Sequence, residues 1–309
     1  MKNILMKSHI MHGTRADEKS IIGLDEPSLI YNYQFSQSRT EHRISHDNSY
    51  RNKNYFNKSF KSSELVHLNY KGIDFSMITC PSDKSIFIDT WGTQYTKEPF
   101  LLGETEVSQD LFESVMGFNH SNLKLKKANN PIINVSWFDC LDFCNRLSDY
   151  FGLGRCYVLN NKKFTNSQYP LSIEEAIVTF IDGANGFRLP REWEWQIAAM
   201  AGTNNQYAGA NDNESVKRVA WFRDNSGDKT HPVAQKLPNE WGFYDMSGNV
   251  WEWCENSNKL NENKDHSAER IIRGSCWKFN NSYLRSVNRV NRSPSTRLQN
   301  LGFRIARSI

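Results

Sequence analysis

The sequence lacks long hydrophobic runs. None of its apolar stretches approaches the roughly 18 residues that a membrane-spanning helix needs. Polar residues interrupt the opening segment, Met1 to Lys7, so we expect neither a signal peptide nor a membrane span. Hydrophobic residues nevertheless make up 38% of the 309 residues, and aromatic residues 13%. This content is enough for a sizeable core and excludes wholesale disorder.

The chain also has little excess of either charge. It holds 38 lysines and arginines against 34 aspartates and glutamates, a formal net charge of +4. These charges are spread along the sequence and do not form one basic stripe. A basic stripe is the usual footprint of nucleic-acid binding, so we expect no nucleic acid as the main partner.

Cysteine is scarce, and its spacing shows no pairing pattern. The six cysteines form neither a C-x-x-C pair nor a dense framework, which predicts free thiols in a reducing compartment, and we expect the cytoplasm. The sequence also lacks a Ser-His-Asp set, a phosphate-binding loop and a dinucleotide fingerprint. His231 has no second histidine or cysteine at metal-binding spacing. The sequence therefore offers no familiar hydrolase, nucleotide-binding or zinc site.

Composition divides the chain into two parts. Residues 1–60 are rich in Asn, Ser, Lys, Arg and His, and their apolar residues follow neither a helix nor a strand period. We therefore predict a disordered polar arm. The folded domain is predicted to span 65–309 and to start with two short strands, at 73–78 and 85–88.

Three helices are predicted from their capping residues and buried faces. The first runs from Ser108 to Gly117, the second from Ser136 to Gly152, and the third from Pro190 to Gly202. Residues 203–309 hold short aromatic segments between Asn, Gly and Asp residues, and no helical period persists there. A compact domain with this much loop usually needs ligands or metals to hold the loops together.

The densest group of functional residue types lies in Gly242 to Trp253. Asp245 and Glu252 flank a turn that contains glycine, and their carboxylates, with inward-pointing carbonyls, form the oxygen-rich ligand set that Ca²⁺ accepts. A second interpretation is structural: Asp245 caps the turn and Glu252 pairs with an arginine. Spacing alone does not decide between the two.

Arginines recur at two places. Arg188, next to the predicted third helix, is expected to bond loop carbonyls or a carboxylate, because an unpaired buried guanidinium is very costly. The C-terminal run from Arg270 to Ile305 places further arginines beside aromatic residues. These arginines either bind a carboxylate or a peptide, or connect loops to the core. Both interpretations stay open.

Several blocks, taken in order, resemble the successive signatures of the formylglycine-generating enzyme, or sulfatase-modifying factor, family. The blocks are Glu104 to Gln109, Pro131 to Trp137, Gly186 to Trp195, Asn225 to Val233, Gly242 to Trp253, Arg273-Gly274 and Gly302 to Arg304. The resemblance covers roughly Phe75 to Arg307. It implies an α+β fold, a single compact domain of C-type-lectin-like architecture that is low in regular secondary structure.

The resemblance also indicates what this chain lacks. In the formylglycine-generating oxidases two cysteines bind copper(I), but alignment places Phe279 and Leu284 at these positions, so we expect no copper. Cys276 falls at the family's active-site serine. The iron-binding histidines of the ergothioneine-type branch come from an extra N-terminal helical domain, for which residues 1–60 are too short and aperiodic.

The family's two calcium sites are retained in part. The first is matched residue by residue, with two backbone carbonyls among its ligands, by Asp245, Gly248, Val250 and Glu252. The second would use Asn225 in place of an aspartate together with the Gly227 carbonyl, but its upstream asparagine maps near Ala220. We therefore expect structural Ca²⁺ at the first site and leave the second open.

Two functions are compatible with the resemblance. The first is an oxidative maturation enzyme, of the pyoverdine-maturation type, that acts on a peptide or small molecule. Its groove would hold the catalytic candidates Cys276, Trp251 and Arg285 and the ligand-binding candidates Trp277, Arg273 and Arg289. The second is a non-catalytic C-type-lectin-like module, similar to the variable proteins of diversity-generating retroelements. Its Asn-rich C-terminal segment would bind a protein, peptide or small-molecule ligand.

Cys276 separates the two functions. Guanidinium groups such as those of Arg273 and Arg285 favour a thiolate, so a side chain facing the groove would make Cys276 the most reactive of the six thiols. Alternatively, Cys276 only replaces a small serine beneath Trp277 and is packed in the core.

Overall fold

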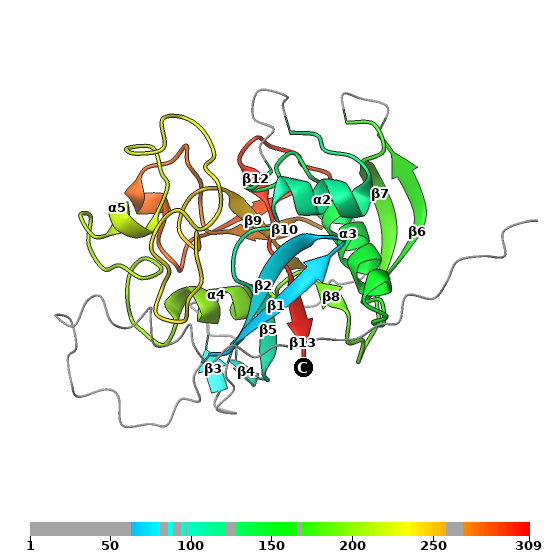
Figure 1. The fold of residues 1–309 in the computed structure, drawn as a ribbon, viewed down its shortest axis with the longest axis horizontal. Coiled ribbons are helices and arrows are strands. Elements are labelled where there is room, and N and C mark those ends of the chain that lie inside the picture. Colours follow the sequence, from blue (N-terminus) through cyan, green and yellow to red (C-terminus); the bar gives the residue numbers. More distant parts are fainter. Residues whose placement is uncertain are drawn as a thin grey trace, which may run out of the picture. The chain divides into compact units, whose positions relative to one another are not determined.

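The last strand of the chain lies inside a sheet, between two strands from earlier parts of the sequence. In the computed structural model the five-stranded sheet has the order β1-β2-β5-β13-β8, and neighbouring strands run antiparallel (Figure 1). Its strands are β1 (Leu65–Tyr70), β2 (Ile73–Cys80), β5 (Phe100–Gly103), β8 (Phe187–Arg188) and β13 (Ala306–Ser308). Ala306 of β13 pairs with Leu102 on one side and with Arg188 on the other.

A second sheet has four strands in the order β11-β10-β9-β12. These are β9 (Trp251–Ser257), β10 (Arg270–Arg273), β11 (Arg289–Arg292) and β12 (Leu301–Gly302). β12 runs parallel to β9 and places Gly302 beside Glu252. β11 is an edge strand that, among the described strands, pairs with β10 alone. Two separate hairpins complete the strands: β3 (Ile86–Ile88) with β4 (Gln94–Thr96), and β6 (Tyr157–Phe164) with β7 (Ile173–Phe180).

The first two predicted helices are confirmed. They are α2 (Gln109–Met116) and α3 (Trp137–Tyr150). α2 ends at Gly117, whose φ of 80° is the left-handed conformation that glycine adopts readily. α3 starts with a capping box, in which Ser136 Oγ accepts from the Asp139 amide at 3.1 Å and Asp139 accepts from the Ser136 amide at 2.9 Å.

The third helix, α4 (Glu192–Met200), begins later than its sequence predicts. Pro190 is not in the first helical turn, because Arg191 still has an extended backbone with ψ of 152°. The Arg191 amide donates to Glu194 at 2.8 Å, and the Pro190 carbonyl instead accepts from the Glu255 amide at 2.9 Å. As predicted, residues 203–257 and 268–309 contain only short helical segments, α5 (Val216–Val219) and η2 (Asn281–Tyr283).

The structure describes residues 63–80, 86–88, 94–96, 98–121, 128–165, 169–257 and 268–309, all within one compact unit. This part of the chain combines helices and sheets, so the predicted α+β class is confirmed. The predicted 1–60 arm lies outside these residues and stays a prediction. None of the helices in the described part is long and apolar enough to cross a membrane.

The core forms where the two helices α2 and α3 pack on the sheets. Phe112 of α2 stacks on Phe143 of α3 with ring centroids 5.5 Å apart, and Phe143 meets Phe303 edge-on at 5.2 Å. Trp137 and Trp253 are fully buried, and each indole N–H donates to a backbone carbonyl. These contacts fix the segments that carry the candidate site, because Phe303 and Trp253 adjoin Arg304 and Glu252.

Candidate functional site

The segment that follows β10 forms a surface built of turns, the short helix η2 and the edge strand β11. We call its exposed and half-buried side chains the C-terminal surface: Trp277, Lys278, Phe279, Tyr283, Arg285, Val287, Asn288 and Arg292. Its backbone is tied to neighbouring loops. The Trp277 amide donates to the Asn249 carbonyl at 2.9 Å, and the Trp277 carbonyl accepts from Ser226 Oγ at 3.0 Å. Asn288 Nδ2 donates to the Ser282 carbonyl at 2.8 Å, which holds the far end of the turn.

Cys276 lies beneath this surface and does not line it. Its side chain has no solvent exposure, and Asn300 Nδ2 donates to its sulfur at 3.0 Å. Burial raises the pKa of the Cys276 thiol to about 11, so the neutral thiol predominates at neutral pH. The prediction of an activated thiolate in a groove is therefore wrong. The residue is packed in the core, as the alternative interpretation proposed.

The side chains at the two copper positions are apolar and engaged in packing. Leu284 is fully buried and packs with Phe222. The Phe279 ring lies 4.9 Å from the Tyr283 ring and meets Trp251 at 6.2 Å. Trp251 itself is only 4% exposed, so it supports the C-terminal surface from below and is not a groove residue. Neither position provides a soft metal ligand.

The candidate arginines divide into buried and exposed ones. Arg273 is fully buried and donates to Glu192 at 2.8 Å, to Gln196 at 3.0 Å and to the Ser286 carbonyl at 2.6 Å. Arg289 Nε lies 3.2 Å from the same Glu192 carboxylate. The predicted ligand-binding role of Arg273 is wrong, because its guanidinium connects β10 to α4. Arg285 is exposed and belongs to the C-terminal surface, as does the half-buried Trp277.

Glu252 of the predicted calcium site forms a buried ion pair. Arg304 donates to its two carboxylate oxygens at 2.6 and 2.7 Å, and Trp195 Nε1 donates at 2.8 Å. Neither Arg304 nor Glu252 has any solvent exposure. The structural interpretation of Glu252, pairing with an arginine, is therefore confirmed. Arg304 also donates to the carbonyls of Gly103 and Tyr244, so one guanidinium joins three segments of the chain.

Two carboxylates beside this pair have unsatisfied oxygens. Asp245 accepts from the Ala234 amide at 2.8 Å through Oδ2, while its Oδ1 is buried without a hydrogen-bond partner. Asp245 therefore binds the backbone of the loop at Ala234 and does not cap its own turn. Both oxygens of Glu106, which is 2% exposed, also lack a partner. Burial raises the pKa of Asp245 to about 6, and burial together with Asp245 raises that of Glu106.

These orphaned oxygens fit a hard cation such as Ca²⁺, which takes carboxylate and carbonyl ligands. Glu106 was missed as a site residue, although it belongs to the Glu104 to Gln109 block. Gly248 is required by the fold itself: with φ of 93°, it lies so near Trp221 that a Cβ would be 2.2 Å from the Trp221 carbonyl oxygen. Val250 is fully buried. Within the described ranges no three His, Cys, Asp or Glu side chains are arranged as a metal-binding set. The first calcium site stays a prediction.

The second calcium site has a different local chemistry. Asn225 Oδ1 accepts from the Phe222 amide at 2.9 Å, and its Nδ2 donates to the Ala220 carbonyl at 3.0 Å. The side-chain amide of Asn225 thus satisfies the carbonyl of Ala220, near which the upstream asparagine of the family maps. Gly227 is exposed in the next turn. This site also stays a prediction, and Asn225 Oδ1 already serves a loop hydrogen bond.

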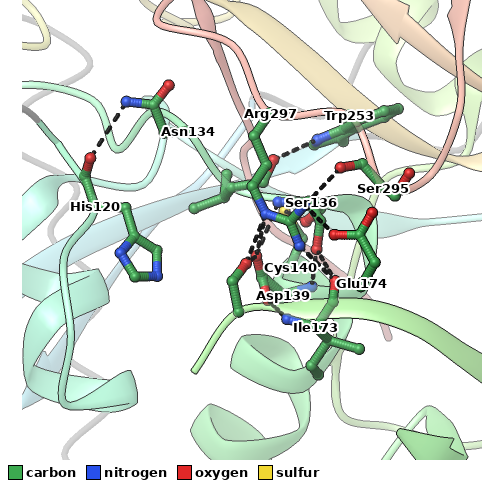
Figure 2. Close-up of polar contacts among 12 residues, drawn as sticks. His120, Asn134, Ser136, Asp139, Cys140, Ile173, Glu174, Trp253, Ser295 and Arg297 are labelled. Carbon is green, nitrogen blue, oxygen red and sulfur yellow. Dashed lines mark hydrogen bonds and ion pairs between the residues drawn. The ribbon is translucent and has the colours of Figure 1, made fainter. Parts of the chain in front are cut away.

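A second buried polar network, centred on Arg297, was not predicted. Figure 2 shows its guanidinium between Asp139, Glu174 and Ser295. Ser172 donates to the Asp139 carboxylate and accepts from Arg297 Nε, while the Ile173 amide donates to Asp139 at 2.7 Å. Only the capping role of Asp139 was visible in the sequence. Every one of these side chains is satisfied within the network, which indicates a structural role.

Comparisons with known proteins show which domain family this chain resembles. Residues 89–309 match the family model of the Sulfatase-modifying factor enzyme 1-like domain. A chaperone protein, LppX, from Paenibacillus barcinonensis is 34% identical over 204 residues, which are 59% of this chain and 70% of LppX. The inactive C-alpha-formylglycine-generating enzyme 2 of Bos taurus is 32% identical over 136 residues, 39% of this chain and 44% of that protein. This chain therefore spans less than half of the cattle protein.

A solved structure of a variable protein covers most of the chain. Treponema denticola variable protein 1 superposes with a TM-score of 0.69 and 29% sequence identity. The superposition includes 79% of this chain and 99% of the variable protein.

Proposed function

Because the chain belongs to the sulfatase-modifying factor enzyme 1-like family, we propose that it is a non-catalytic member that binds a polypeptide at the C-terminal surface. The burial of the Cys276 side chain is the main observation behind this proposal. An oxidase of this family needs two thiolates for copper, and Phe279 and Leu284 stand at their positions in this chain. Cys276, at the position of the active-site serine, is fully buried and its pKa is raised to about 11.

The composition of the C-terminal surface supports binding. Tyr283 is 46% exposed and Val287 is 41% exposed, and they lie among asparagine and arginine side chains. Tyrosine, tryptophan and arginine dominate the energetics of protein interfaces, while asparagine and serine provide adaptable hydrogen bonds. The backbone contacts of Trp277 and Asn288 keep these side chains in place before a ligand arrives, which reduces the entropy lost on binding.

The names of the relatives also support a non-catalytic binding function. One is called inactive and one is called a chaperone, and the structural neighbour is called a variable protein. A retroelement-type variable protein would have a near-copy of the codons for residues 276–300 downstream of its gene, differing at adenines. Sequencing the neighbouring DNA tests this subtype. If no such near-copy is found, the protein is a binding module that does not diversify.

Binding itself is tested by selecting peptides from an unbiased display library on the purified protein. We expect the selected peptides to lose binding to a Tyr283→Ala variant and to keep binding to a Tyr150→Ala variant. Tyr150 is also a partly exposed tyrosine, at 39%, but it lies at the end of α3. Peptides that bind both variants equally would contradict the proposed site.

Catalysis is tested separately. The protein is incubated with copper(I), oxygen and a peptide that carries a sulfatase cysteine, beside an active formylglycine-generating enzyme as positive control. We expect no aldehyde product from this chain, because no pair of exposed thiols is available to hold the metal. An aldehyde formed at a rate near that of the control would overturn the proposal.

We further propose that Ca²⁺ stabilises the fold near Asp245 and Glu106, and that the protein works in a reducing compartment such as the cytoplasm. The orphaned carboxylate oxygens support the calcium, and six buried cysteines without a disulfide support the compartment.

A further inference from the structure

Although the charges of the whole chain are nearly balanced, they are not evenly spread, because the C-terminal part is strongly basic. Residues 270–309 contain nine arginines and lysines and no aspartate or glutamate. The chain as a whole has a net charge of only +4, so the remaining residues are net acidic. The positive charge of the chain is therefore concentrated in the part that contains the C-terminal surface.

Burial separates these basic residues into two groups. Three of the buried members pair with carboxylates on other segments: Arg273 with Glu192, Arg304 with Glu252, and Arg297 with Glu174. Their charges are neutralised inside the protein, where an unpaired guanidinium would be very costly. The fold therefore accounts for these arginines, and they are not available to a ligand.

The exposed members are different. Lys278, Arg285 and Arg292 are exposed, and none of them forms an ion pair with a residue in the described part of the chain. Arg292 NH1 donates to the neighbouring Asn291 carbonyl, which leaves its remaining N–H groups directed to solvent or a ligand.

We propose that the C-terminal surface selects acidic stretches of polypeptide. This inference rests on the proposed binding function and names its ligand class. Lys278, Arg285 and Arg292 supply charge complementarity to aspartate and glutamate side chains, while Asn288 and Tyr283 pair with peptide groups and pack on the chain. A polypeptide fits better than a nucleic acid, because phosphate binding typically uses a longer run of basic contacts than three separated cations.

The probe for this test is a labelled peptide of alternating glutamate and serine, with an equally long lysine and serine peptide as its opposite. Binding is measured by fluorescence anisotropy to the full chain and to the triple variant Lys278→Gln, Arg285→Gln, Arg292→Gln. We expect the triple variant to bind the acidic peptide about tenfold more weakly, since exposed ion pairs are individually modest. The basic peptide should not bind either protein.

A second triple variant removes the same charge elsewhere. Arg146→Gln, Arg155→Gln and Lys163→Gln alter exposed side chains on α3, on the loop that follows it and on β6, and should leave the affinity for the acidic peptide within about twofold of the original. An equal loss in both triple variants would mean that only net charge matters and would overturn the proposal. So would a single-stranded oligonucleotide that binds more tightly than the acidic peptide and shows the same loss in the first variant.

The display selection separates the failure of this inference from failure of the binding function. If the selected peptides depend on Tyr283 but contain no excess of aspartate and glutamate, the surface binds polypeptides and the acidic class is wrong. If no selected peptide depends on Tyr283, the proposed function fails as well. Enrichment of acidic residues together with dependence on Arg285 supports both.

Discussion

Arg304 forms a bidentate ion pair with Glu252 through two guanidinium nitrogens, and neither side chain has any solvent exposure. The two residues are 52 positions apart and belong to different segments. The same guanidinium reaches the carbonyls of Gly103 and Tyr244, and the same carboxylate accepts from Trp195. One ion pair thus connects both sheets with α4, and its loss would affect the whole domain.

Removing one partner of this pair should destabilise the protein strongly. We expect Glu252→Gln or Arg304→Met to lower the free energy of unfolding by about 3–5 kcal/mol, because each leaves an uncompensated buried charge. The double variant should cost less than the two single changes combined. Urea denaturation of the four proteins measures the coupling, and additive losses would show that the two side chains do not interact.

Calcium should raise the melting temperature, and chelation should lower it. A cation that binds only the folded state stabilises it by mass action, and the orphaned oxygens of Asp245 and Glu106 offer it ligands. The double variant Asp245→Asn, Glu106→Gln should lose this calcium dependence. The purified protein should hold no stoichiometric copper by metal analysis. An identical melting temperature with calcium and with chelator would contradict the calcium site.

The pH dependence of stability should contain a contribution from His120. Burial, and to a lesser extent Arg297, lowers the pKa of His120 from 6.5 to about 4. Between these values the unfolded chain binds a proton that the folded protein does not, so the free energy of unfolding falls as the pH drops from 6.5 towards 4. A His120→Gln variant should show a smaller decrease between pH 7 and pH 5 in urea denaturation. Equal slopes for the two proteins would refute this assignment.

Cys276 should be slow to alkylate in the native protein. Its thiol is fully buried, and a pKa of about 11 leaves very little thiolate near neutral pH. Burial likewise raises the pKa of Cys140 and Cys144 on α3. We therefore expect iodoacetamide to label all three only after unfolding in urea, as peptide mapping would show. Rapid labelling of native Cys276 would reopen the enzymatic interpretation.

Gly248 should not tolerate a side chain. An alanine Cβ would lie 2.2 Å from the Trp221 carbonyl oxygen, and φ of 93° is unfavourable for any residue with a Cβ. Gly248→Ala should therefore reduce stability by several kcal/mol or prevent folding. Gly72→Ala is a matched control, because Gly72 also has positive φ, of 89°, but nothing lies near its Cβ position. Similar losses in the two variants would show that backbone strain, and not the close approach, is responsible.

Local signals in the sequence predicted local structure well. The capping box at Ser136 and the glycine at 117 located α3 and α2 because both features act within one helical turn. The family resemblance then supplied the fold class. The β6–β7 hairpin and β13 were not predicted, because short strands depend on which segments pair with them.

The site was harder to predict, because burial is a property of the folded chain. Cys276 and Arg273 follow one another closely and looked suited to a common groove, yet both point into the core. The partner of Glu252 could only be named as some arginine, since Arg304 is distant in sequence. Arg285 was predicted as a catalytic candidate in a groove; the structure shows its side chain exposed, and its role stays a prediction.

The position of β13 has a consequence for synthesis of the protein. The strand lies between β5 and β8, so the five-stranded sheet stays divided until residues 306–308 have left the ribosome. Arg304 and β12 are translated just before β13. Until then the Glu252 carboxylate, which is buried in the folded protein, has no arginine to pair with. The nascent chain must therefore expose the edges of β5 and β8 until this segment is translated, and such unpaired edges are open to aggregation for longer than in a chain whose sheet forms in sequence order.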